Sequence, residues 1–156
     1  MSAVVIANAE VRISNTDALL PGLKFDRLNL RMSDELKNRT KKFALDVIGL
    51  CSGLPHTLET RHAIGQVIRS SSSVAANYQS ACRGKSKADF IAKLGIVEEE
   101  ADESGFCLEM LCDIAERRHL PIDARTSTEL ARLVGEANQL VAITVTSRKT
   151  APGSDR

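Results

Sequence analysis

Aromatic side chains are scarce in this chain, which has no Trp, one Tyr and four Phe among 156 residues. A core without large rings must be filled by Leu, Ile, Val and Ala, as is typical of helix bundles. The hydrophobic fraction of 43% is large enough for such a core, and the length suits one domain. Few rings also disfavour the reading of nucleic-acid bases by stacking.

Net charge is nearly absent as well. Lys and Arg number 21 against 20 Asp and Glu, which leaves a formal charge of +1. The chain therefore lacks the large positive net charge typical of nucleic-acid-binding proteins, although these numbers allow a local basic patch. No apolar run approaches the ~20 residues that span a bilayer, and the first residues lack a basic leader. We expect a cytoplasmic protein with no membrane partner.

Motifs for catalysis are missing too. The sequence contains no Gly-rich phosphate loop, no nucleophile elbow and no Cys–His pairing. The four cysteines, Cys51, Cys82, Cys107 and Cys112, form no CxxC pair and lie among small or apolar residues, so we interpret them as core residues rather than zinc ligands. The sequence predicts no enzyme activity and no cofactor.

Two Glu-x-x-His pairs, Glu59/His62 and Glu116/His119, have the spacing used in di-iron helix bundles. Both pairs fall at the ends of predicted helices, whereas such metal sites lie in the middle of a bundle. We therefore predict no metal site.

The chain divides into three parts. We expect residues 1–31 to form a poorly ordered N-terminal arm, residues 32–150 to form the bundle and residues 151–156 to form a frayed tail. Ser33 has the properties of a helix N-cap, and Asp34 and Glu35 suit the positive end of a helix.

Four helices are predicted, over about Ser33–Cys51, Thr57–Cys82, Ser86–Arg118 and Thr126–Thr150. The short connections between them predict an all-α, antiparallel, up-down-up-down four-helix bundle. The third helix has the clearest apolar seam. Its members are Phe90, Leu94, Val97, Ala101, Ser104, Leu108, Leu111 and Ala115.

A polar stripe follows the second predicted helix at i, i+3, i+7 and i+11. It consists of Gln66, Arg69, Ser73 and Asn77, and the third helix offers the carboxylates Glu98, Glu99, Asp102 and Glu103 to the arginine. One interpretation is a functional polar site that faces helix three or a neighbouring subunit. We favour a structural network that fixes the register of the bundle. Its predicted members are Gln66, Arg69, Ser73, Asn77, Glu99 and Glu103.

Basic residues gather at the turn between the second and third helices, namely Arg83, Lys85, Lys87 and Lys93. This cluster is the best candidate in the chain for binding RNA or DNA, through phosphates rather than bases. The alternatives are a solvated turn, or a basic patch that meets the acidic run Glu98–Glu103 of a neighbouring subunit.

Several segments together resemble a known bacterial family. They are Phe43-Ala44-Leu45, Leu54-Pro55, Gln66 with Arg69, Ser73-Val74-Ala75-Ala76-Asn77-Tyr78, Arg83 with Ser86, Lys87 to Leu94, Glu98 to Ser104, and Glu136-Ala137. The order and spacing of these segments are similar to those of proteins encoded in intervening sequences of 23S ribosomal RNA genes, the S23-type proteins.

The resemblance implies a four-helix bundle that is often a homopentamer, similar to the nucleic-acid-binding accessory protein of diversity-generating retroelements. Two places depart from the family pattern: Ser80 stands where a Glu is usual, and Gly105-Phe106-Cys107 stands where aromatic residues are common. Gly105 should also weaken its helix by about 1 kcal/mol relative to Ala.

Apolar residues on more than one stripe, such as Ile91 and Ile96, independently predict a homo-oligomer. We therefore expect a non-catalytic oligomeric scaffold, with a nucleic-acid-binding accessory protein as the alternative.

Overall fold

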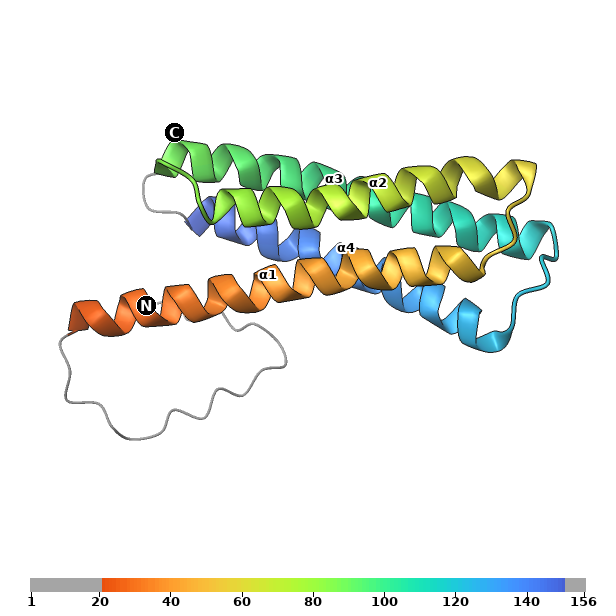
Figure 1. The fold of residues 1–156 in the computed structure, drawn as a ribbon, viewed down its shortest axis with the longest axis horizontal. Coiled ribbons are helices and arrows are strands. Elements are labelled where there is room, and N and C mark those ends of the chain that lie inside the picture. Colours follow the sequence, from red (N-terminus) through yellow and green to blue (C-terminus); the bar gives the residue numbers. More distant parts are fainter. Residues whose placement is uncertain (1–20, 151–156) are drawn as a thin grey trace.

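The computed structural model describes the backbone of residues 21–150 and the side chains of residues 33–150. Four helices make up this part of the chain: α1 (Pro21–Gly53), α2 (Leu58–Ala81), α3 (Lys87–Arg117) and α4 (Ala124–Thr150). Each helix runs antiparallel to the next, and α4 returns beside α1 (Figure 1). The described chain contains no strand, so the predicted all-α, up-down-up-down bundle is confirmed.

Two of the predicted helix starts are confirmed by their caps. Thr57 accepts a hydrogen bond from the backbone N–H of Thr60, and the Thr60 hydroxyl accepts one from the N–H of Thr57, which makes a reciprocal capping box. Ser86 accepts a hydrogen bond from the N–H of Asp89 over 3.1 Å. These caps satisfy backbone donors that have no partner inside their helices.

The other two helices start earlier than predicted. α1 begins at Pro21 rather than at Ser33, because proline fits the first turn of a helix, where no N–H is needed. The Ser33 hydroxyl instead donates to the sulfur of Cys82 over 3.1 Å. α4 begins at Ala124 rather than at Thr126, because the Asp123 carboxylate accepts a hydrogen bond from the N–H of Thr126. Residues 1–20 of the predicted arm 1–31, and the predicted tail 151–156, lie outside the described residues.

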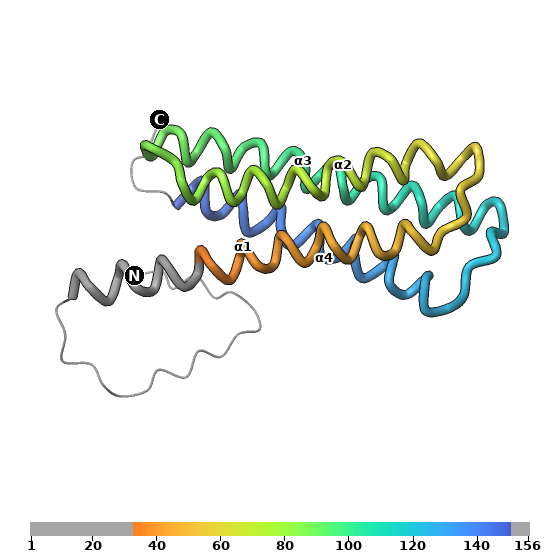
Figure 2. The backbone as a smooth tube through the Cα atoms, viewed as in Figure 1, coloured from red at the N-terminus to blue at the C-terminus, as the bar shows by residue number. Residues whose placement is uncertain are grey.

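The backbones of the four helices lie alongside one another (Figure 2). They share a largely aliphatic core, as the composition predicts. The α3 seam is buried at Leu94, Val97, Ala101, Ser104, Leu108 and Leu111, while Phe90 is only partly buried. Phe43 of α1 is the largest side chain that is completely enclosed. No helix of the described chain is long and apolar enough to cross a membrane.

Two buried serines form a polar contact between α2 and α3. The run Ser70–Ser73 has poor helix propensity, yet α2 continues through it without a break. Ser70 and Ser104 are fully buried, and their hydroxyl oxygens lie 2.8 Å apart. Each hydroxyl also lies within hydrogen-bond distance of a backbone carbonyl of its own helix, Ser70 of Val67 and Ser104 of Glu100, so either serine can be the donor between them. Small side chains thus let the two helices approach, and packing overrides propensity.

Gly105 has a packing role in α3. It is buried, and a Cβ added there would lie 3.5 Å from the Cβ of Ala137 in α4. The helix runs through this glycine without interruption. Gly105 on α3 and Ala137 on α4 are both small, so the two helices lie close together at this point.

Candidate functional site

The polar stripe of α2 divides into two separate groups. The Nε of Arg69 donates a hydrogen bond to the side-chain oxygen of Gln66 over 3.3 Å. The same guanidinium forms ion pairs with Glu100 and Glu103 of α3. The side-chain amide of Asn77 donates to the Ser73 hydroxyl, within α2, over 2.9 Å.

Glu99, which we expected in this network, lies outside it. The side chain is exposed on the outer face of α3, whereas Glu100 and Glu103 lie on the side of α2. One residue is about 100° of rotation around a helix, which is enough to move a carboxylate from one face to another. Arg69 itself is half exposed, so its ion pairs connect α2 and α3 at the surface rather than in the core.

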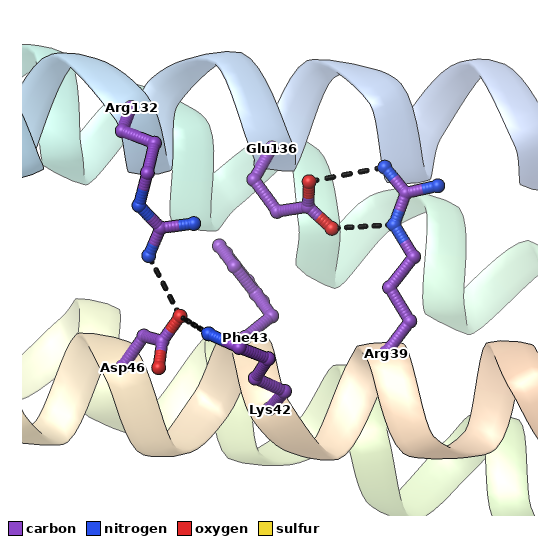
Figure 3. A pocket seen from close by; sticks show the side chains of 6 residues that line it. All are labelled: Arg39, Lys42, Phe43, Asp46, Arg132 and Glu136. Atoms are coloured by element: carbon purple, nitrogen blue, oxygen red, sulfur yellow. Dashed lines mark hydrogen bonds and ion pairs between the residues drawn. The ribbon is translucent and has the colours of Figure 1, made fainter. Parts of the chain in front are cut away.

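A groove of about 260 Å³ lies between α1 and α4 and is lined by charged residues (Figure 3). Arg39 of α1 forms a two-pronged contact with Glu136 of α4, at 2.6 and 3.0 Å. Arg132 of α4 donates to Asp46 of α1 over 2.6 Å, and Lys42 pairs with the same carboxylate. Phe43 closes the inner side of the groove.

These contacts change the acid–base properties of the groove. Burial alone would raise the pKa of Asp46, yet hydrogen bonds from Lys42 and Arg132 outweigh it, so the pKa lies below its ordinary value. The hydrogen bond from Arg132 also lowers the pKa of Glu129. Every charged side chain that lines the groove already has a partner of opposite charge. The groove is therefore best explained as ion pairing that holds α1 against α4.

The basic turn is a tight connection with free charges. A Cβ at Gly84 would lie 3.0 Å from the carbonyl oxygen of Ala81, so only glycine fits without a shift. Arg83, Lys85 and Lys87 are exposed, and within residues 33–150 none of them lies in ion-pair distance of a carboxylate.

Lys93 differs from the other three predicted basic residues. It is partly buried, and its ammonium group lies 3.6 Å from the carboxylate of Asp89. Asp89 also accepts a hydrogen bond from the backbone N–H of Lys85. The basic turn is therefore defined below as Arg83, Lys85 and Lys87.

An acidic surface covers the outer side of α3 and overlaps the acidic run Glu98–Glu103 that the sequence analysis singled out. Between Lys93 and Arg117 this helix carries no basic residue. We define the acidic face as Glu99, Asp102 and Glu109 around Phe106, which share one side of the helix by spacing. All three carboxylates are exposed and lack an ion pair within the described side chains. Phe106 is 62% exposed in the middle of them.

Thiol and metal chemistry find no support in the part of the chain described. Burial raises the pKa of the Cys51 thiol to about 11, and it also raises the pKa of Cys107 and Cys112. Thiols with a raised pKa remain protonated and are poor nucleophiles. Among residues 33–150, no three His, Cys, Asp or Glu side chains converge in a way that could hold a metal ion.

Comparisons with known proteins agree with this architecture. The family described as 23S rRNA-intervening sequence protein matches residues 33–139. The chain belongs to this family. A crystal structure of a protein with unknown function from the S23 ribosomal protein family, from Bacteroides thetaiotaomicron, is 24% identical and has a TM-score of 0.58. The match covers 73% of this chain and 98% of that one. No match was found among curated proteins.

The match to the 23S rRNA-intervening sequence family covers the basic turn, the acidic face and both arginines of the groove. The likeness to the Bacteroides protein concerns the fold alone at this level of identity. The comparisons therefore establish the family and the bundle.

The ion pairs of Asp46 lead to a prediction about acid stability. Because the folded-state pKa of Asp46 is lowered, its contribution is present above the unfolded-state pKa of about 4 and is lost as the pH falls through the folded-state value. We expect Asp46→Asn to lower the free energy of unfolding by about 0.5–1 kcal/mol near neutral pH, since the pairs are partly exposed. Urea denaturation at about pH 7 and about pH 3 should show this difference shrinking in acid.

Glu35→Gln is the matched control, because Glu35 is exposed and has no ion pair within residues 33–150. It should leave the free energy of unfolding unchanged at both pH values. An equal effect of Asp46→Asn at both pH values would contradict the role of its charge.

Proposed function

We propose that this protein is a non-catalytic, cytoplasmic homo-oligomer, a pentamer as the family resemblance implies, and that it acts as an interaction scaffold. The observation that carries the proposal is the exposure of large apolar side chains on outer helix faces. Leu45 and Ile48 of α1 are 58% and 38% exposed, and Ile96 and Phe106 of α3 are 42% and 62% exposed. Exposed apolar groups that cluster on a helix face are typical of surfaces that associate.

The internal polar groups support a structural rather than a catalytic role. The groove between α1 and α4 has its charges paired, and the buried serines bond to each other. Catalytic groups, in contrast, are typically titratable side chains in a cleft with unsatisfied or shifted partners. The features left for function are therefore on the outside of the bundle.

Replacing Leu45 and Ile48 by Ser tests the role of the apolar surface of α1. We expect the wild-type chain to have a mass of several subunits in light scattering at micromolar concentration, and the double variant to have a smaller mass. The reason is that burying these side chains contributes about 25 cal/mol per Å² at an interface. Circular dichroism should show an unchanged helical content, since neither side chain is in the core.

Leu58→Ser is the matched control for this experiment. Leu58 is 78% exposed, but it is the first residue of α2 and therefore lies at the end of a helix rather than along its outer face. Its replacement should leave the mass unchanged. A wild-type mass of one subunit would refute the proposed scaffold.

A second candidate function is favoured by the basic turn. Arg83, Lys85 and Lys87 are exposed without carboxylate partners in the described chain, which makes them available to phosphates. The family's description mentions 23S rRNA, so structured RNA is the first polymer to test. Three phosphate contacts per subunit bind weakly, but repetition in an oligomer raises the avidity.

A filter-binding titration with structured RNA and duplex DNA at two salt concentrations tests this candidate. We expect Arg83→Glu with Lys85→Glu to abolish binding that the wild type shows at low salt. Arg61→Glu with Arg125→Glu, which changes two exposed cations elsewhere by the same charge, should retain it. Absence of binding by the wild type to either polymer would refute the nucleic-acid function and would leave the scaffold proposal unaffected.

A further inference from the structure

We propose that the acidic face of one copy, Glu99, Asp102 and Glu109 around Phe106, binds the basic turn of a second copy. This inference rests on the proposed self-association and names the two surfaces that meet. It commits to a second copy of this chain because the two surfaces are complementary in charge.

The free charges on the two surfaces match in number. Arg83, Lys85 and Lys87 are exposed cations without an ion pair among residues 33–150. The three carboxylates of the acidic face are likewise exposed and unpaired in that part of the chain. With a net charge of only +1, the chain carries these opposite charges as two separate patches. Such patches favour and orient association between copies.

The two surfaces cannot meet within one chain. Lys87 is the first residue of α3 and Phe106 lies on the same helix. At 1.5 Å per residue the two positions are about 28 Å apart along a rigid element. Only a neighbouring molecule can bring a basic turn to an acidic face.

Phe106 supplies an apolar anchor for the contact. Its ring is 62% exposed, while its helical neighbours Asp102 and Glu109 are charged. A basic turn offers groups that suit this ring, because a guanidinium such as that of Arg83 stacks on aromatic faces and the methylene stem of a lysine covers them. A ring rimmed by charges of one sign is the arrangement expected of an interface centre with a polar edge.

The proposed contact joins two different surfaces, which limits the symmetry of the assembly. The two surfaces are different, so the contact is heterologous: each copy uses its turn on one neighbour and its face on the other. Repetition of such a contact closes into a ring or extends into a filament. Because the charges are exposed, added salt should weaken the contact.

Reversing the charges of one surface, and then of both surfaces together, tests the pairing. We expect Glu99→Lys with Asp102→Lys, and separately Lys85→Glu with Lys87→Glu, each to lower the association constant about 10-fold or more. The chain that carries all four substitutions should regain the mass of the wild type, because its face and turn are again complementary. Light scattering at about 50 mM and about 500 mM salt measures the mass, and thermal melts by circular dichroism check that each variant is folded.

Arg61→Glu with Arg125→Glu is the control of equal charge change and should keep the wild-type mass, because both arginines are exposed and lie near the first residues of α2 and α4. This inference would be overturned if both double variants kept the wild-type mass, or if the variant with all four substitutions did not regain it. An oligomeric wild type would still support the scaffold in that case. A monomeric wild type would overturn both. Since Glu99→Lys with Asp102→Lys keeps the basic turn, it also separates self-association from any binding of RNA.

Discussion

The pairing of α2 with α3 depends on two serines that have no contact with water. Ser70 and Ser104 are fully buried and share a hydrogen bond of 2.8 Å. Larger side chains at these positions would separate the helices, and apolar ones would remove the polar contact that fixes their register. Above and below this point the seam is aliphatic, with Val67 on α2 and Leu108 on α3. A polar contact within an apolar seam is a common means of specifying one alignment of helices.

The contact of α1 with α4 combines surface ion pairs with a buried aromatic ring. The helix α1 relies here on ion pairs of Arg39 and Asp46 at the surface as well as on the buried Phe43. Exposed ion pairs contribute little stability each, but they restrict the partners that a helix accepts. The charged groups of this groove are used within the bundle. The proposed function therefore uses the outer faces, where apolar side chains and charges without a partner in residues 33–150 lie together.

Much of the fold could be predicted from the sequence because helical periodicity is a local property. The seam of α3 and the caps at Thr57 and Ser86 follow from residue type and spacing alone. The start of α1 at Pro21 could not be predicted in this way, because Ser33 has the local properties of a helix N-cap. In the structure the helix continues through Ser33, and the Ser33 hydroxyl contacts Cys82 instead.

The site was harder to predict than the fold because its contacts depend on rotation around each helix. In the run Glu98-Glu99-Glu100, consecutive carboxylates point to different sides, and the sequence does not determine which one meets Arg69. Glu98 contacts Arg148 of α4, Glu100 contacts Arg69 of α2, and Glu99 faces outward. The acidic face around Phe106 became apparent only when the paired carboxylates could be separated from the unpaired ones.

A double-mutant cycle on Ser70→Ala and Ser104→Ala tests most directly whether buried polar contacts hold the bundle in register. Urea denaturation of the wild type, both single variants and the double variant gives the coupling energy. Each single variant should lose about 1 kcal/mol, and the double variant should lose clearly less than the sum, because the second substitution no longer breaks a hydrogen bond. Losses that simply add would contradict the account, since the two serines would then act independently.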